Sequence, residues 1–434
     1  MKKVTLGLAV VLSTAAILSA CSSGNSESSA SSANASSNGT EKSEKVTLKF
    51  WYPGTDEILT GAVTDVITKF EQAHPDIHVE PTFIPWADYF QKLTVAYSGG
   101  LQPDVHGLGF GQLISTVNQG KYLDLTPYIQ KDQWAGEKDF FPDILEAGQY
   151  KGGQYGLLLP EIRPLAWRKD FFKEAGLDPE TPPKTFDEIF DFAEKLKVVN
   201  GGTTERAGID IQTSNGEQSY LSLLFLLGED FYDTDGNPTF DSPKSIELVQ
   251  KMVDLYKSGA IIPSNQQQIN GTPFQNSQAA ISFTSAQGIA ELRKTVGEEN
   301  IGWALPPAGP EGERTALMLG TFLTAAQKTK HPEAAWEFIK FFFEDDNVLE
   351  FTTKTGAIPP LQSLKDDYVK LGPAYAAAFE ALNDAKGYGA SGNWAINVKY
   401  LRLALEEAYN GIRPVEEALK ANADLAREEI ESAK

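Results

Sequence analysis

The feature that most limits how this chain can fold is an alternation of strand-like and helix-like segments from Val46 to Lys434. Val46, Leu48 and Phe50 occupy every second position, as one buried face of a strand requires. Residues 62–73 repeat apolar side chains at helical spacing, and residues 77–80 resume the strand pattern after a proline. Strands that alternate with helices predict an α/β architecture.

Further along the chain, three helix starts can be identified. Thr185 and Glu188 form a capping box, while Pro243 and Pro332 occupy the first-turn position where proline is tolerated. Apolar runs shorter than a typical helix predict buried strands at three places: 155–159, 279–283 and 301–305.

The first residues predict export from the cytoplasm. Lys2 and Lys3 precede an uncharged apolar run, Leu6–Leu18, and small residues lead into Cys21. This pattern predicts a signal peptide over residues 1–20, because the apolar run is too short to cross a membrane as a helix. The Leu-Ser-Ala-Cys sequence resembles the bacterial lipobox, which implies that Cys21 is lipidated and anchors the chain to the outer face of the cell membrane. The alternative is an ordinary signal peptide that happens to contain a cysteine.

The segment that follows predicts a tether. Ser22–Lys45 holds ten serines among 24 residues and no aromatic or large aliphatic side chain. Such a composition cannot bury enough apolar surface to offset chain entropy. We therefore expect residues 21–45 to be a disordered link between the lipid and the folded body, an arrangement that fits a Gram-positive source.

Composition excludes several classes of function. Cys21 is the only cysteine, so the body has no disulfide, thiolate metal site or thiol nucleophile. Without Lys2 and Lys3 the formal charge is 36 − 59 = −23, which argues against a nucleic-acid partner. No metal or cofactor is predicted. The run Asp233–Asn237 begins like a calcium loop but lacks the later glycine and acid, and an Asp-Gly turn explains it better.

Taken in order, the motifs of the body resemble the extracellular solute-binding proteins of family 1, the group that contains the maltose-binding protein. The resemblance covers nearly all of Val46–Lys434. It is carried by Lys49-Phe50-Trp51, Gln102-Pro103-Asp104-Val105, Tyr122-Leu123-Asp124-Leu125, Tyr150-Lys151-Gly152, Arg168-Lys169-Asp170-Phe171-Phe172, His331-Pro332-Glu333-Ala334-Ala335-Trp336 and Gly356-Ala357-Ile358-Pro359.

This resemblance implies two lobes with a ligand cleft between them. The expected lobes are 46–159 with 306–350, and 160–305 with 351–434. The implied protein is a monomeric, non-catalytic receptor that captures a mono- or oligosaccharide and delivers it to the membrane permease of an ABC importer. A sensor or adhesion protein on the same fold remains an alternative, as does a lipid-anchored glycoside hydrolase. Whether the ligand is neutral or anionic stays open, because Arg163 and Arg168 lie near the expected cleft.

A sugar offers an apolar C–H face and a rim of hydroxyl groups, which aromatic platforms and paired donors and acceptors hold best. Aromatic residues near strand ends and in the glycine-rich stretch before the last helices are therefore candidates: Trp51, Trp86, Phe110 and Trp394. Trp336, by contrast, is expected in the core.

Polar candidates come from the expected crossing between lobes and from other strand ends. Glu161 aligns with a position where the family often carries a ligand-binding acid, and Arg163 lies two residues on, on the same side of an extended chain. An ion pair between the lobes is the alternative role for these two. Gln212 and Gln287 are further candidates, with Gly109 and Thr321 as weaker ones.

Overall fold

The computed structural model describes residues 45–263, 271–388 and 391–433. The chain divides into two units, residues 1–43 and 44–434, and every described residue belongs to the second. The predicted signal peptide, Cys21 and all of the predicted tether except Lys45 lie outside the described residues. Among the described helices, none is both long and apolar enough to cross a membrane.

The first of two main sheets has the strand order β13-β12-β3-β1-β2, with β6 paired to β12. β1 is parallel to β2 and β3, whereas β12 runs antiparallel to β3 and β6. The strands are β1 (Val46–Pro53), β2 (Ile77–Ile84), β3 (Val105–Gly109), β6 (Leu157–Arg163), β12 (Ala316–Ala325) and β13 (Ala385–Lys386).

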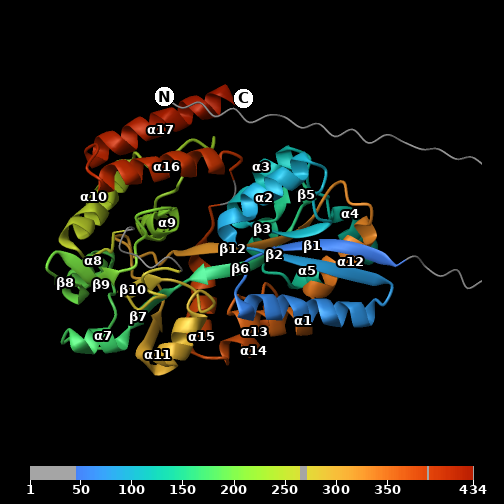
Figure 1. Ribbon diagram of the computed structural model, residues 1–434, viewed down its shortest axis with the longest axis horizontal. Coiled ribbons are helices and arrows are strands. Elements are labelled where there is room, and N and C mark those ends of the chain that lie inside the picture. Colours follow the sequence, from blue (N-terminus) through green and yellow to red (C-terminus); the bar gives the residue numbers. More distant parts are fainter. Residues whose placement is uncertain (1–44, 264–270, 389–390, 434) are drawn as a thin grey trace, which may run out of the picture. The chain divides into compact units, whose positions relative to one another are not determined.

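Helices cover both faces of this sheet (Figure 1). α2 (Trp86–Ser98) and α3 (Leu113–Asn118) lie on one face, and α1 (Glu57–Ala73), α12 (Pro332–Phe342) and α13 (Asp345–Thr355) lie on the other. α1 begins where the Asp56 carboxylate accepts a 2.8 Å hydrogen bond from the Leu59 N–H. Phe70 on its buried face packs against Phe338 of α12, with ring centroids 5.1 Å apart. Phe338 in turn packs against Phe50 of β1, at 5.0 Å. The smaller elements here are α4 (Thr126–Asp132), α5 (Gly136–Asp139), α6 (Pro142–Glu146), β4 (Gln149–Tyr150), β5 (Gly153–Gln154) and η1 (Phe110–Gln112).

The chain enters the second sheet at Pro164, between β6 and β7. This sheet has the order β11-β7-β10-β9-β8. Its strands are β7 (Leu165–Arg168), β8 (Val198–Asn200), β9 (Thr203–Ile209), β10 (Ala279–Phe283) and β11 (Ile301–Ala304). The remaining helical elements are α7 (Lys169–Glu174), α8 (Phe186–Leu196), α9 (Glu217–Leu226), α10 (Pro243–Ser258), α11 (Ala290–Val296), η3 (Glu298–Asn300), η4 (Gln362–Leu364), α14 (Lys365–Val369), α15 (Pro373–Ala381), η5 (Leu382–Asp384), α16 (Trp394–Tyr409) and α17 (Val415–Ser432).

The structure confirms the elements predicted from sequence, with shifts of a few residues at their ends. Thr185 caps α8 by accepting from the Glu188 N–H, and Ser242 caps α10 in the same way one residue before Pro243. Trp336 is buried, as expected for a core residue. The predicted lobe boundaries stay a prediction. They place β13 in the second lobe, whereas β13 pairs with β12 in the first sheet.

Candidate functional site

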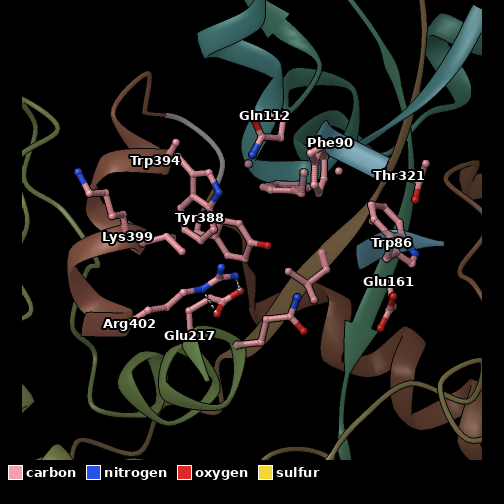
Figure 2. A pocket seen from close by; sticks show the side chains of 18 of the residues that line it. Trp86, Phe90, Gln112, Glu161, Glu217, Thr321, Tyr388, Trp394, Lys399 and Arg402 are labelled. Atoms are coloured by element: carbon pink, nitrogen blue, oxygen red, sulfur yellow. Dashed lines mark hydrogen bonds and ion pairs between the residues drawn. The ribbon is translucent and has the colours of Figure 1, made fainter. Parts of the chain in front are cut away.

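Elements from both halves of the fold enclose a cavity of about 570 Å³. Its lining combines large aromatic rings with charged and amide side chains (Figure 2). The lining residues are Trp86, Phe90, Gly109, Phe110, Gly111, Gln112, Glu161, Arg163, Glu217, Gln218, Leu319, Gly320, Thr321, Tyr388, Trp394, Ala395, Val398, Lys399 and Arg402.

One side of the cavity is formed by Trp86 and Phe90, which we call the α2 wall. These two rings lie one turn apart on α2, with centroids 5.8 Å apart. Gly109 at the end of β3 makes room for them, because a Cβ there would be 2.8 Å from Cζ of Phe90. Trp86 is 43% exposed, so a large part of its surface is available for contact with a ligand.

The opposite side is formed by Tyr388 and Trp394, the α16 wall. Their rings stack with centroids 3.8 Å apart and planes 11° apart. Trp394 also packs edge-on against Phe231 and is only 6% exposed. Gly111 lies against this wall, since a Cβ there would be 2.3 Å from Nε1 of Trp394. Burial raises the pKa of Tyr388 well above that of a free tyrosine, so its hydroxyl stays protonated at neutral pH.

A bidentate ion pair lies beside the α16 wall (Figure 2). The Arg402 guanidinium donates from Nε and Nη2 to the two carboxylate oxygens of Glu217, at 2.8 and 2.6 Å. Glu217 stands in the first turn of α9 and Arg402 on α16, so the pair joins two helices that are distant in sequence. The Glu217 side chain is 9% exposed and that of Arg402 41%, which leaves the arginine as the more accessible partner.

A second polar pair lies on β6. Nε of Arg163 donates to Oε1 of Glu161 at 3.3 Å, and about a quarter of each side chain is exposed. Arg163 lines a small space together with the buried side chain of Asp210, which accepts hydrogen bonds through Oδ2 from Thr272 and Ser282. Burial raises the pKa of Asp210, whereas the charge of Arg163 acts in the opposite direction.

Seven of the ten ligand-contact candidates predicted from sequence line this cavity: Trp86, Gly109, Phe110, Glu161, Arg163, Thr321 and Trp394. Gln287 borders a smaller adjoining cavity of about 60 Å³, which shares Trp86, Glu161 and Thr321 with the larger one. The ligand roles of these residues are proposals that the cavity supports.

Trp51 and Gln212 lie outside both cavities. β1 continues to Pro53, so Trp51 lies within the strand rather than at its end, half-buried against the core. Gln212 belongs to the turn before α9, where its backbone N–H donates to Oγ of Ser219 at 3.2 Å. Arg168 is also outside, since it pairs with Asp170.

Sequence reasoning missed Phe90, Gln112, Glu217, Gln218, Tyr388, Lys399 and Arg402. A signal for part of this set was available. Trp394, Val398 and Arg402 recur every four residues and therefore share one face of α16. Glu217 had no comparable signal, because its role depends on a partner 185 residues away.

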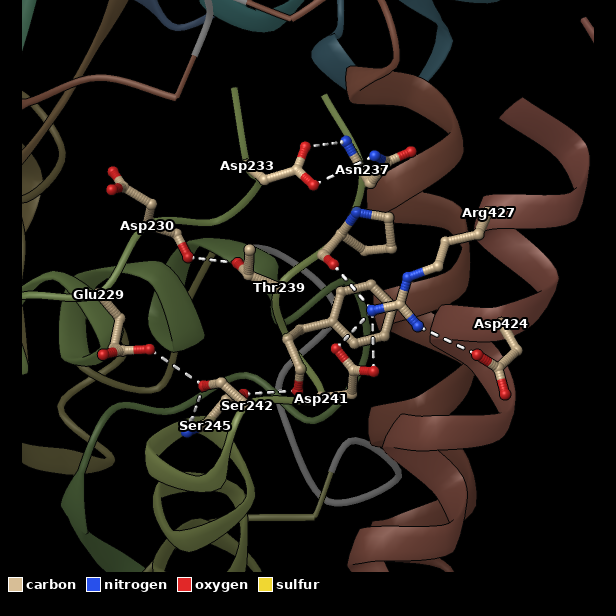
Figure 3. A network of polar contacts seen from close by, with 12 residues as sticks. Glu229, Asp230, Asp233, Asn237, Thr239, Asp241, Ser242, Ser245, Asp424 and Arg427 are labelled. Atoms are coloured by element: carbon tan, nitrogen blue, oxygen red, sulfur yellow. Dashed lines mark hydrogen bonds and ion pairs between the residues drawn. The ribbon is translucent and has the colours of Figure 1, made fainter. Parts of the chain in front are cut away.

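The Asp233 loop is a turn stabilised by its own hydrogen bonds (Figure 3). Oδ1 of Asp233 accepts from the backbone N–H of Asn237 at 2.8 Å. It also accepts from the backbone N–H of Asp235 at 2.9 Å. Nearby, Arg427 of α17 donates to both oxygens of Asp241 at 2.8 Å and so ties this region to the C-terminal helix. Within the described residues, no group of three His, Cys, Asp or Glu side chains is placed to hold a metal ion.

Known proteins resemble this chain in both sequence and fold. A putative binding protein of Brucella abortus (strain 2308) is 28% identical over 74% of this chain and 78% of its own. The sn-glycerol-3-phosphate-binding periplasmic protein UgpB of Escherichia coli K12 is 25% identical over 74% and 75%. These relatives are binding proteins and not enzymes.

Among solved structures, an ABC substrate-binding protein from Listeria monocytogenes in complex with cycloalternan has a TM-score of 0.78 at 20% identity, covering 89% of this chain and 99% of its own. An ABC transporter solute-binding protein from Thermotoga lettingae, bound with α-D-tagatose, has a TM-score of 0.79 at 21% identity, covering 88% and 99%. This likeness confirms the predicted α/β, two-lobed binding-protein fold.

A family profile described as bacterial extracellular solute-binding protein matches residues 56–348, which is more than half of the chain. The chain therefore belongs to the family of bacterial extracellular solute-binding proteins, as the order of its sequence motifs indicated.

Proposed function

We propose that this protein is the extracytoplasmic substrate-binding component of an ABC importer and that it captures a mono- or oligosaccharide in the cavity. The observation that carries the proposal is the pair of aromatic walls on opposite sides of one cavity, with hydrogen-bonding side chains between them. Such a lining matches a sugar ring, whose C–H face packs on an aromatic surface while its hydroxyls point to the rim.

The bound ligands of similar proteins support this proposal. The structures with comparable folds include one with cycloalternan, one with α-D-tagatose and one with mannobiose. Relatives that bind sn-glycerol-3-phosphate show that the family also takes a phosphorylated polyol.

The delivery step and the membrane anchor belong to the same proposal. The two lobes, 46–159 with 306–350 and 160–305 with 351–434, would close on the ligand by a hinge motion that a membrane permease reads. Lipid on Cys21 would hold the monomeric receptor at the outer face of the membrane, with residues 22–45 as its tether.

Ligand binding is tested on residues 21–434 carrying Cys21→Ser, with any co-purified ligand removed by mild denaturation. A panel of neutral sugars, uronates, sugar phosphates, amino acids and peptides is screened by thermal shift and then by calorimetry. Ligand at 100 times its Kd adds about 2.7 kcal/mol of stability, which raises Tm by roughly 5–10 °C for a protein of this size. Turnover of an oligosaccharide, or a response to peptides alone, would contradict the proposal.

Variants then test whether the ligand occupies this cavity. Trp86→Ala removes the exposed aromatic surface and should raise the Kd at least tenfold. Trp51→Ala is the matched control, because it removes a tryptophan that lies outside the lining. Equal losses in the two variants would place the ligand elsewhere.

The anchor has its own test. Cells that express the full chain are fractionated after labelling with a fatty acid, and Cys21→Ser should lose the label and appear in the soluble fraction. Retention of the Cys21→Ser variant in the membrane fraction would contradict lipid anchoring at this residue.

A further inference from the structure

Each cation in the described lining of the cavity already has a carboxylate partner. Arg163, Lys399 and Arg402 are the cations in its described lining, and each forms an ion pair with a carboxylate. From this pairing we infer that the cavity selects an uncharged saccharide over a phosphorylated or carboxylated one. The inference deepens the proposed function and rests on it.

The Arg402–Glu217 pair is the strongest part of the argument. The carboxylate receives two parallel hydrogen bonds, so the two guanidinium nitrogens that face it are occupied. A guanidinium has five N–H donors, and Glu217 takes two of those of Arg402. An anion at the other donors would lie close to the Glu217 carboxylate, and an anion could take over the bidentate edge only by displacing Glu217. That displacement would leave the nearly buried Glu217 without its partner and next to a second negative charge, which is costly at low exposure.

Arg163 also has a carboxylate partner. It pairs with Glu161 on its own strand, and it lines the small space that also contains Asp210. An anion approaching Arg163 therefore meets a carboxylate that is already bound to the guanidinium. The repulsion from the Glu161 carboxylate opposes the attraction of the single positive charge of Arg163.

Lys399 is the most exposed of the three cations. Its ammonium group contacts Oε2 of Glu429 at 2.5 Å, and Glu429 belongs to α17 outside the cavity lining. Counting this partner, the three cations are balanced by Glu161, Glu217 and Glu429. The lining by itself therefore has a net charge of 3 − 2 = +1, and Glu429 brings the sum of these ion pairs to zero, in contrast to the unpaired positive charge that an anion site needs.

A hydroxyl group suits this arrangement better than an anion does. It donates to a carboxylate and accepts from a guanidinium at the same time, so it joins an existing ion pair without breaking it. Two features favour an anion instead: α2 and α16 begin at Trp86 and Trp394 in the lining, and helix N-termini attract negative charge. This attraction is weak compared with the loss of a bidentate ion pair whose carboxylate is nearly buried, so the pairing decides the selectivity.

The inference is tested with matched ligand pairs on residues 21–434 carrying Cys21→Ser. Calorimetry compares glucose with glucose 6-phosphate and glucuronate, glycerol with sn-glycerol-3-phosphate, and mannobiose and maltose with oligosaccharides that end in a uronate. The neutral member of a responding pair should bind at least tenfold more tightly. Tighter binding of the charged member would overturn the inference while keeping the proposed function. Binding of no saccharide at all would overturn both.

A charge variant tests the cause. Glu217→Gln frees Arg402, so it should shift the ratio of neutral to anionic affinity toward the anion by at least tenfold. Glu217→Asp retains the negative charge and should keep the neutral preference. Glu407→Gln is the matched control, because Glu407 pairs with Arg413 on the same helical hairpin but outside the cavity lining. If Glu217→Gln folds and its ratio of neutral to anionic affinity is unchanged, the role assigned to the Arg402–Glu217 pair is wrong. If this variant does not fold, the ligand comparison on the unsubstituted cavity decides the selectivity.

Discussion

The two aromatic walls of the cavity differ in how they are supported. Trp86 of the α2 wall is 43% exposed, whereas Trp394 of the α16 wall is 6% exposed and held between Tyr388 and Phe231. The α2 wall therefore offers accessible aromatic surface to a ligand, whereas the α16 wall is part of the core and borders the cavity. The position of a tryptophan in the cavity lining therefore does not by itself tell whether its removal affects ligand binding or stability.

The largest effect should come from removing the buried ring. Trp394→Ala would leave a large void beside Tyr388 and should lower the free energy of unfolding by about 3–5 kcal/mol. Chemical denaturation followed by circular dichroism measures this change. A loss below about 1 kcal/mol would show that the α16 wall is not part of the core.

Acid should weaken the support of the α2 wall. Tyr97 of α2 contacts Nε2 of His106 at 2.8 Å, and Nδ1 of His106 contacts the Gly107 carbonyl at 3.0 Å. Burial lowers the pKa of His106 from 6.5 to about 4. In the unfolded chain this histidine is protonated near pH 6.5, whereas in the folded chain it stays neutral until the pH approaches 4. Stability is therefore lost as pH falls from 6.5 toward 4.

This loss should reach on the order of 2 kcal/mol between pH 7 and pH 5. The measurement is the free energy of unfolding against pH for the wild type and for His106→Gln. The wild type should have the steeper profile over this range, and parallel profiles would contradict the role assigned to His106.

Alanine substitutions at two glycines, one beside each wall, allow the packing of the two walls to be compared. Gly111→Ala would bring a Cβ within 2.3 Å of Nε1 of Trp394, and Gly109→Ala would bring one within 2.8 Å of Cζ of Phe90. Because the α16 wall is confined by its neighbours, Gly111→Ala should cost about 1–3 kcal/mol of stability. Gly109→Ala should cost less, since it meets the far end of a side chain in the more exposed wall. Equal costs, measured by chemical denaturation, would remove this distinction.

The smallest effect on stability is expected for Trp86→Ala. Trp86 is 43% exposed and therefore adds less to the core than Trp394 does, so the free energy of unfolding should change by less than about 1 kcal/mol. Affinity for the responding sugar should nevertheless fall at least tenfold in calorimetry. A stable variant with unchanged affinity would show that the exposed ring does not contact the ligand.

The strength of a local pattern explains which predictions succeeded. The Thr185 capping box and the prolines at 243 and 332 are short-range signals, and the helices begin where they indicate. Trp51 shows the limit of such reasoning. Its sequence neighbours predict a strand, but the point at which that strand ends depends on pairing with β2 through Pro53.

Some cavity residues also depend on local geometry, whereas others depend on partners that are distant in sequence. Glu161 and Arg163 are two residues apart on one strand, so their pairing follows from the extended geometry. Tyr388 and Glu217 escaped prediction because each acquires its role from a residue on another element, Phe110 or Trp394 in one case and Arg402 in the other.

The sequence by itself determined the α/β class, most helix and strand positions, the family and much of the aromatic lining. These depend on periodicity, capping and motif order, which act over a few residues or survive as a pattern along the chain. Only the tertiary structure decided which tryptophan is exposed, which is buried, and that Glu217 matches the charge of Arg402. Burial and ion pairing arise from residues that are distant in sequence, because the space and charge around a side chain are set by whatever the fold brings next to it.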